Sequence, residues 1–441
     1  MLAAAGSAVG LGNIWRFPYL AAKYGGGIFL LVYVVLALTF GFTLMTAEIA
    51  IGRKTGLSVV GAYRRLDRRF SFLGYLAAIV PMIILPYYCV IGGWVCKYLA
   101  VFATGRGAAS AEAGFFEGFI SRPLEPVGWL AIYLGMTALV VLFGVEKGVE
   151  KVSKVLMPVL VVLSIVVAAY SVSLPGAWEG VKYYLIPDFS RFSTTTVLAA
   201  MGQMFYSMSL AMGIMVTYGS YMKKEVDLTK SVGHIELFDT GIAFLAGLMV
   251  VPAVFAFSGG TPEALGQGPG LMFVSLPQVF NAMGGGTVIG SVIGVAFFLL
   301  VLFAALTSSI SLMETVVSIL GDKLRWSRKT ACGVVALGAF ILGVPSSLGY
   351  GALDAIKPLG MSILDFWDFL SNSVLMPIVA LLTCIFVGYF VGTKAVSDEV
   401  KLSSKFRREK LFRVMIRYIA PVFVVAVLVS SVLSGLGVFQ I

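Results

Sequence analysis

Long apolar stretches separated by short polar segments dominate the pattern of this chain. A helix rises 1.5 Å per residue, so about 20 apolar residues are needed to cross about 30 Å of hydrocarbon. Eleven stretches meet this need, although the ninth is short and the tenth is long. They lie near residues 2–23, 27–51, 72–103, 127–144, 153–173, 194–219, 233–257, 287–320, 330–345, 360–392 and 411–434. The pattern predicts an all-α membrane protein with eleven transmembrane helices, not an outer-membrane barrel, whose strands would read as short alternations.

The first and sixth stretches carry features that disfavour a continuous helix. The first has three glycines, Gly6, Gly10 and Gly12, and the sixth has glycine and serine between residues 202 and 213. Glycine in a membrane helix also permits close packing, which is the alternative explanation for each stretch alone. The two stretches hold corresponding positions in two groups of five, a pattern typical of inverted-repeat transporters with a site at the midplane. We therefore expect one five-helix repeat over 1–173, a second, inverted one over 194–392, and an extra helix over 411–434.

Composition and charge agree with a multi-pass protein of the cell (inner) membrane. The chain is 59% hydrophobic and 12% charged, and 24 of its 32 Lys and Arg residues lie on alternate loops. The positive-inside rule places those loops and the N-terminus in the cytoplasm, and the C-terminus outside. The net charge of +10 is then a matter of topology, and no nucleic-acid partner is expected. No cleavable signal peptide precedes the first stretch.

Few side chains in the sequence could carry enzymatic chemistry. A single histidine, His234, and cysteines confined to apolar runs argue against histidine-ligated metals and a disulfide framework. An intramembrane enzyme is therefore not expected, because it needs a convergent nucleophile and base or metal ligands.

Polar residues inside the apolar stretches are the candidates for function. A carboxylate at membrane depth is costly unless paired, which makes Asp239 a candidate and puts Glu48 and Glu314 under the same suspicion, although these two could simply bond loop backbone. Thr307 and Ser308 could donate hydrogen bonds to their own helix or turn their oxygens towards a hard cation such as sodium.

Four motifs resemble the neurotransmitter:sodium symporter family as found in bacteria. They are Ala8-Val9-Gly10-Leu11-Gly12-Asn13-Ile14-Trp15-Arg16-Phe17-Pro18, Gly25-Gly26-Gly27, Gly202-Gln203 with Ser207-Met208-Ser209, and Leu306-Thr307-Ser308-Ser309. The resemblance runs from the first stretch to the eleventh. It implies a symporter that imports an amino acid by alternating access, with two co-transported sodium ions and the lipid bilayer as its surroundings.

The resemblance also implies positions for the two sodium ions. The first sodium matches the Ala8 carbonyl, the Asn13 side chain, Ser207 and Asp239. The second matches the carbonyls of Gly6, Val9 and Ala304 with the hydroxyls of Thr307 and Ser308. A substrate carboxylate would complete the first site, so that sodium and substrate raise each other's affinity.

A substrate pocket and two gates carry over in the same way. The carboxylate matches the N–H groups of Leu11 and Gly12 and the Tyr88 hydroxyl, and the ammonium matches the carbonyls of Ala8, Tyr206 and Ser207 with the Ser209 hydroxyl. The side chain would meet Ile84, Tyr88, Tyr206, Met212, Ser308 and Leu312. This lining suits a hydrophobic or aromatic amino acid. Arg16 and Asp365 match an outer gate with Tyr206 as its lid and Gln203 beside it, and Asp322 matches the acidic half of an inner gate.

Departures from the family pattern add further expectations. Ala243 occupies the place of a serine found in chloride-dependent members, with Asp239 one turn earlier, so chloride-independent transport is expected. The chain starts five residues before Gly6 and leaves Asp322 without the family's basic partner, so either the sequence is truncated or inward closure differs. A carrier of another small zwitterion, such as a betaine, and a sodium-dependent amino-acid sensor that does not transport are the alternative functions.

Overall fold

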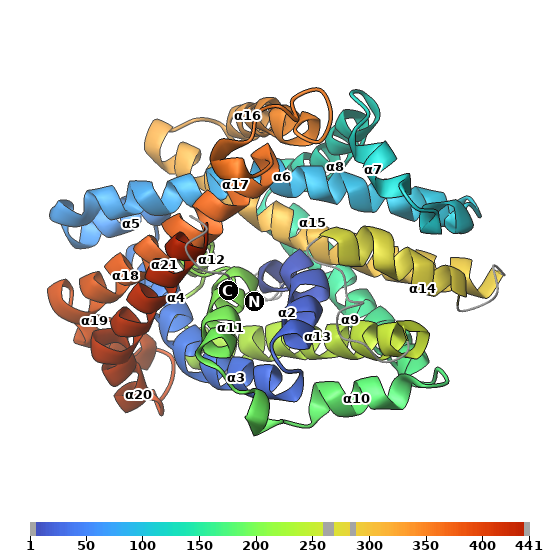
Figure 1. The fold of residues 1–441 in the computed structure, drawn as a ribbon. Helices are drawn as coiled ribbons and strands as arrows, with labels where there is room; N and C mark the ends of the chain where they lie inside the picture. Colours follow the sequence, from blue (N-terminus) through green and yellow to red (C-terminus); the bar gives the residue numbers. More distant parts are fainter. Residues whose placement is uncertain (1–5, 259–268, 283–287, 436–441) are drawn as a thin grey trace.

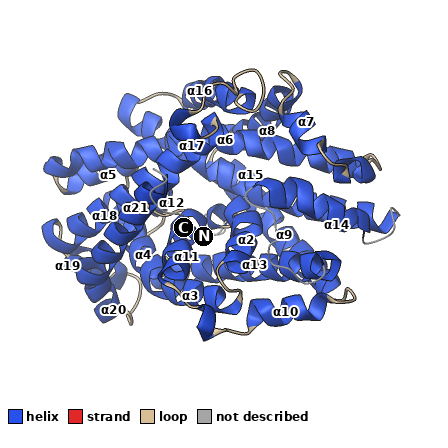
Figure 2. Cartoon of the chain, in the orientation of Figure 1, coloured by secondary structure: helices blue, strands red, loops and turns tan. Residues whose placement is uncertain are grey.

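The computed structural model describes residues 6–258, 269–282 and 288–435, and this part of the chain is helical, with no strand (Figure 2). The predicted limits at residues 2–5 and at 287 lie outside it. The helices are α2 (Phe17–Lys23), α3 (Gly27–Leu36), α4 (Phe42–Thr55), α5 (Val59–Leu66), α6 (Ser71–Ala103), α7 (Phe115–Ile120), α8 (Glu125–Leu142), α9 (Lys151–Val172), α10 (Ala177–Leu185), α11 (Thr194–Ser207), α12 (Ile214–Ser220), α13 (Leu228–Ser258), α14 (Leu276–Ala282), α15 (Val288–Leu324), α16 (Arg328–Leu348), α17 (Ile363–Asp368), α18 (Met376–Ile385), α19 (Thr393–Lys401), α20 (Glu409–Val414) and α21 (Ala420–Gly435).

Within the described ranges, nine continuous helical segments are long and apolar enough to cross a membrane. They are Gly27–Thr55, Arg68–Ala103, Glu125–Leu142, Lys147–Val172, Leu228–Phe257, Ile289–Leu324, Arg328–Leu348, Ile363–Phe390 and Glu409–Gly435. These segments correspond to the predicted spans two to five and seven to eleven. The predicted first and sixth spans are the two exceptions, because each is divided into shorter pieces. The all-α membrane fold expected from the sequence is confirmed.

The first span is interrupted at Val9 and Gly10, where the chain bends out of helical geometry. A π-helical turn (Gly12–Arg16) and α2 then complete the span. The interruption leaves backbone N–H and C=O groups without partners inside a helix, as at any helix end.

The sixth span is interrupted between α11 and α12. Residues 208–213 form turns, and Ser209, Ala211 and Gly213 have φ values of 54°, 60° and 74°. Positive φ is unfavourable for residues other than glycine, so the surrounding packing must hold Ser209 and Ala211 in place. The glycine and serine residues of this segment indicated the interruption in the sequence, whereas Ala211 gave no sign of its positive φ.

The long helices pack round these two interruptions. Helix α6 packs against α8, α15 and α16, helix α13 packs against α9 and α10, and α12 packs against α4. Figure 1 shows the long helices running across the view, with α2 and α11 near the middle. The interrupted segments contact each other directly, since Asn13 Nδ2 donates to Ser207 Oγ at 2.9 Å.

The basic loops gather at one end of the molecule, the end that carries α5 and α19 on the left of Figure 1. Contacts between loops show this grouping. The Asp322 carboxylate accepts from the Ser58 N–H at 2.7 Å, and Arg53 pairs with Glu399. Arg328 donates to the Val141 carbonyl at 2.8 Å. We call this the α5 end; the short helix α7 lies at the opposite end.

Candidate functional site

A small cavity of about 30 Å³ lies where the two interrupted spans meet α6 and α15. The structure brings together around it all eleven residues that the sequence proposed for a substrate: Ala8, Leu11, Gly12, Ile84, Tyr88, Tyr206, Ser207, Ser209, Met212, Ser308 and Leu312. Ser7, Gly10, Asn13 and Ile214 also line it. Among these described lining residues none carries a charge. The polar groups that border the cavity are therefore hydroxyls, the Asn13 amide and backbone of the two interrupted spans.

The Asp239 carboxylate lies at the centre of a buried polar cluster next to this cavity. One of its oxygens, Oδ1, accepts hydrogen bonds from Asn13 Nδ2 at 2.8 Å and from Ser207 Oγ at 2.5 Å. Asp239 is fully buried, and no Lys or Arg in the described part of the chain pairs with it. A buried carboxylate without a cationic partner is costly, so this cluster is suited to hold a cation.

Tyr33 belongs to the same cluster and was missed by the sequence reasoning. Its hydroxyl donates to Asp239 Oδ2 at 2.8 Å and lies 3.2 Å from Ser207 Oγ. The only signal in the sequence was a phenol in the middle of an apolar stretch. Since tyrosines are common in membrane spans, nothing in the pattern linked Tyr33 to a residue 206 positions away.

A second group of oxygens lies where α15 meets the interruption of the first span. The Thr307 hydroxyl lies 3.0 Å from the Ala304 carbonyl and 3.4 Å from the Val9 carbonyl. The Ser308 hydroxyl lies 3.1 Å from the carbonyls of both Val9 and Ser7. Gly6 lies next to the same group, since a Cβ added at Gly6 would stand 3.3 Å from Thr307 Cβ.

These contacts separate the two hypotheses for the hydroxyl pair. Thr307 bonds within its own helix, as the local explanation predicts, and also reaches the Val9 carbonyl. Ser308 bonds across to the first span instead. The five residues proposed for a second sodium therefore lie together, and the Ser7 carbonyl joins them.

The backbone of the first span is also exposed to the cavity. The Leu11 N–H donates to the Tyr88 hydroxyl at 3.3 Å, a long bond that can be exchanged for a better acceptor. Gly10 lies so close that a Cβ there would be 2.5 Å from Ser308 Oγ and 3.1 Å from the Tyr88 hydroxyl. Leu11, Tyr88 and Ser308 thus border one space.

Three residues expected at the outer gate contact one another or the lining of the cavity. The Arg16 guanidinium stands 5.1 Å from the centre of the Tyr206 ring, within cation–π range. Gln203 Nε2 donates to the Gly12 carbonyl at 2.8 Å. Arg16 therefore lies against Tyr206, and Gln203 is bonded to Gly12, and both Tyr206 and Gly12 line the cavity.

The acidic partner of Arg16 differs from expectation. Asp365 is exposed and accepts a hydrogen bond from Ser362 at 2.8 Å, with no ion pair to Arg16 in this conformation. Asp368, three residues further along the same face, accepts from Tyr87 at 3.2 Å and from Asn372 at 2.6 Å. The i, i+3 spacing put both acids on one face, so the sequence alone could not choose between them.

The remaining candidate acids make polar contacts at the α5 end and at the interruption of the sixth span. Asp322 binds the Ser58 backbone, as described above. Glu48 Oε1 accepts from the Ala211 N–H at 2.8 Å and so supports the strained turn of the sixth span. Glu314 pairs with Arg328 and accepts from the Tyr221 hydroxyl at 2.8 Å. Glu48 therefore bonds backbone, but the backbone of the interrupted sixth span and not that of a loop.

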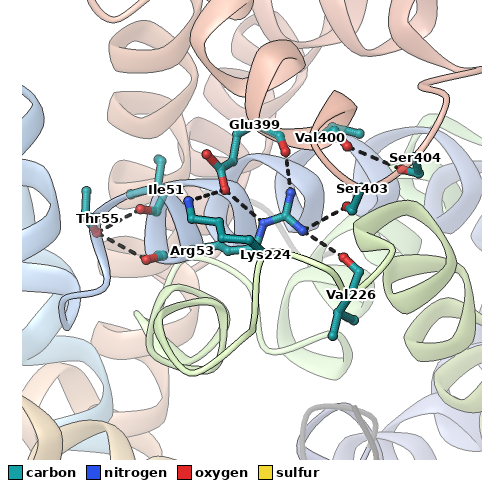
Figure 3. A network of polar contacts seen from close by, with 10 residues as sticks. Ile51, Arg53, Thr55, Lys224, Val226, Glu399, Val400, Ser403 and Ser404 are labelled. Carbon is teal, nitrogen blue, oxygen red and sulfur yellow. Dashed lines mark hydrogen bonds and ion pairs between the residues drawn. The ribbon is translucent and has the colours of Figure 1, made fainter.

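A further buried network was not anticipated. Figure 3 shows Arg53 of α4 between Glu399 of α19 and the Val226 carbonyl. Arg53 Nε lies 2.9 Å from Glu399 Oε1, and its Nη1 donates to Val226 at 2.9 Å and to Ser403 at 3.1 Å. Lys224 reaches the same carboxylate at 2.7 Å. This network joins α4, the loop before α13 and the loop after α19.

Comparisons with known proteins agree with this architecture. The model of the sodium:neurotransmitter symporter family matches residues 1–107 and 120–436. The sodium-dependent transporter YhdH of Bacillus subtilis is 34% identical over 439 residues, covering 98% of this chain and 96% of that protein. The crystal structure of MhsT in complex with L-phenylalanine is similar with a TM-score of 0.88 and 38% identity, covering 98% of this chain and 97% of that one. The chain therefore belongs to the sodium:neurotransmitter symporter family and is a sodium-dependent membrane transporter rather than an enzyme.

Proposed function

We propose that this transporter imports hydrophobic or aromatic L-amino acids together with sodium by alternating access, and that it does not need chloride. The observation that carries the proposal is the uncharged cavity between the two interrupted spans, bordered by Ile84, Met212 and Leu312. Its apolar side chains fit an apolar ligand, and the backbone groups of the interrupted spans fit the charged ends of an amino acid. MhsT, which shares the fold, binds L-phenylalanine.

The amino acid is proposed to lie with its carboxylate at the N–H groups of Leu11 and Gly12 and at the Tyr88 hydroxyl. Unpaired N–H groups at a helix break favour an anionic group. The ammonium then meets the carbonyls of Ala8, Tyr206 and Ser207 and the Ser209 hydroxyl. The cavity is small in this conformation, so Met212, whose side chain is flexible, is expected to move when a large side chain enters.

Two sodium ions are proposed to travel with the substrate. The first would bind Ala8, Asn13, Ser207 and Asp239, since the unpaired Asp239 carboxylate needs a cation. The second would bind the oxygens of Gly6, Val9, Ala304, Thr307 and Ser308. Two charges moving through 100 mV release about 4.6 kcal/mol, which supports about two thousandfold accumulation of a zwitterion before any sodium gradient is counted.

The fixed charge of Asp239 is also the reason for proposing chloride independence. A carboxylate buried beside the first sodium supplies a negative charge that a chloride ion would otherwise have to bring. Replacing chloride by gluconate should leave sodium-driven uptake unchanged. A severalfold rise in uptake on adding chloride would contradict this part of the proposal.

The remaining features fit alternating access between two five-helix repeats, residues 1–173 and 194–392, with α20 and α21 as the extra helix. Arg16, Tyr206 and Gln203 would form the outer gate with Asp365 or its neighbour Asp368, and Asp322 would belong to the inner gate. The α5 end is proposed to be cytoplasmic in the cell (inner) membrane, because the basic loops gather there.

Uptake into proteoliposomes tests the proposal. Labelled tryptophan, tyrosine and leucine are offered with sodium outside, or with potassium on both sides. We expect accumulation only with the sodium gradient, and none by Asp239→Ala, while the exposed control Asp398→Asn transports normally. Equal accumulation without sodium, or competition by glutamate and lysine as strong as that by leucine, would overturn it.

A further inference from the structure

A cavity of about 450 Å³ opens at the α5 end, well away from the substrate site. Its walls come from the start of α13, the first turn of α4 and the loop between α19 and α20. Four of its lining residues are basic: Lys230, Lys405, Arg407 and Arg408. Basic loops are expected wherever the positive-inside rule operates. These four side chains are exposed as well, but they line one open cavity at the surface.

The charges in this cavity are only weakly neutralised. Lys405 and Arg407 have no ion pair within the described residues. Arg408 lies 3.8 Å from Glu236 Oε2, and the exposed Lys230 lies 4.0 Å from Asp227 Oδ2, at the edge of ion-pair range. Four cations against two carboxylates leave a net positive site. Such a site attracts an anionic group, and guanidinium groups are well suited to the oxygens of a phosphate.

The cavity continues into a lipid-facing surface. Leu31, Val35 and Leu38 are each at least 40% exposed and follow one face of the second span. Phe42 lies one turn further along and lines the cavity, with the Arg408 guanidinium 4.8 Å from its ring centre. An apolar stripe therefore leads directly to the basic pocket.

The inner part of this stripe lies beside α13, because Ala37–Gly41, which includes Leu38, packs against that helix. Helix α13 also carries Lys230 and Glu236 of the cavity, so the stripe and the cavity lie along the same helix.

The Arg53 network of Figure 3 holds the walls of the cavity in position. Arg53 binds Val226, next to Asp227, and Ser403, next to Ser404, and both Asp227 and Ser404 line the cavity. The two loops that carry the basic side chains are thus fixed to α4 by a buried guanidinium. A positioned set of cations loses less side-chain freedom on binding than a mobile one.

We propose that this cavity binds the phosphate headgroup of an anionic phospholipid from the adjoining leaflet, with an acyl chain along the Leu31–Leu38 stripe. Basic pockets between transmembrane helices commonly bind such headgroups. The apolar stripe is the reason for choosing a lipid over a free phosphate, because a soluble anion would make no use of it. The site is separate from transport, so its test does not depend on the proposed substrate.

Native mass spectrometry of the detergent-purified protein provides the test. Phosphatidylglycerol, phosphatidylcholine, glycerol 1-phosphate and inorganic phosphate are titrated separately, and bound molecules are counted. We expect one tightly retained phosphatidylglycerol and no comparable binding of the other three. Equal retention of phosphatidylcholine would overturn the role of the cations. Competition by glycerol 1-phosphate or inorganic phosphate as strong as that by the lipid would overturn the lipid as the source.

Two double variants complete the design. K405Q/R407Q removes the two unpaired cations of the cavity and is expected to weaken phosphatidylglycerol binding about thirtyfold, from about one kcal/mol for each basic residue. K394Q/K410Q removes the same charge from exposed residues of the same region that do not line the cavity, and should bind as the wild type does. None of the four side chains is buried, so both variants should fold. Equal binding by the two would overturn the proposal.

Discussion

Replacing Tyr88 by phenylalanine removes one oxygen from the cavity and leaves the ring in place. Tyr88 is 4% exposed, and its hydroxyl accepts from the Leu11 N–H at 3.3 Å. In the proposed complex this hydroxyl donates to the substrate carboxylate instead. The substitution therefore acts mainly on the complex, because the hydrogen bond that it removes from the free protein is long and weak.

The magnitude follows from the kind of hydrogen bond that the complex loses. A hydrogen bond to a charged group contributes about 1.5–3 kcal/mol, which corresponds to a tenfold to roughly 150-fold rise in the dissociation constant of the amino acid. Removal of the weak hydrogen bond from the Leu11 N–H in the free protein offsets part of this, so the lower half of the range is expected. Because substrate and sodium are linked through the same site, the sodium concentration for half-maximal binding should rise as well.

Binding of labelled leucine and phenylalanine to the purified protein at saturating sodium measures the effect. Tyr63→Phe is the matched control, since it removes a buried hydroxyl that bonds Thr383 at 2.9 Å and does not line the cavity. We expect the control to bind as the wild type does. An unchanged dissociation constant in Tyr88→Phe would refute the proposed position of the carboxylate.

Three further substitutions probe other parts of the molecule. Asp239→Asn removes the buried charge, so sodium-dependent uptake should disappear without chloride and return in part when chloride is added. Uptake assays in chloride and in gluconate measure this effect. Full activity in gluconate would contradict the role of the Asp239 charge. Gly10→Ala places a Cβ 2.5 Å from Ser308 Oγ and should abolish amino-acid binding in a folded protein, whereas Gly202→Ala, with nothing within 4 Å, should bind normally. Glu399→Gln leaves the buried Arg53 without its carboxylate and should lower the free energy of unfolding by about 3–5 kcal/mol. Thermal unfolding would show a lowered Tm relative to the exposed control Asp398→Asn, and equal Tm values would show that the pair contributes nothing.

Much of the fold was predictable because its causes are local in sequence. Hydropathy marked the spans, since each must satisfy its own backbone within the bilayer. Glycine-rich runs marked the two interruptions, which the structure places at Val9–Gly10 and at 208–213. The motif residues around them line one cavity, as their resemblance to the family implied. In these cases a residue's own chemistry, or that of its near neighbours, was enough.

Residues that act through distant partners could not be found in this way. Tyr33 joins the Asp239 cluster, and Asp368, not Asp365, is the partly buried acid that bonds Tyr87 and Asn372. Nothing in their local pattern distinguishes them from an ordinary tyrosine in a span or from a second acid on the same helix face. The choice depends on which side chain the neighbouring helices bury and which they leave exposed.

The Arg53–Glu399 pair and the basic cavity beside it also depend on partners that are distant in the sequence. From the sequence alone, each of these residues was one more charge in a loop, and the positive-inside rule predicted only that these loops share one side of the membrane. The pairing of Arg53 with Glu399 across 346 positions, and the gathering of Lys405 and Arg407 around one cavity, exist only after the helices pack. Hydropathy and local backbone preference determine where a chain crosses the bilayer and where a helix breaks. Only tertiary packing determines which charges are buried together and which remain free to bind a ligand.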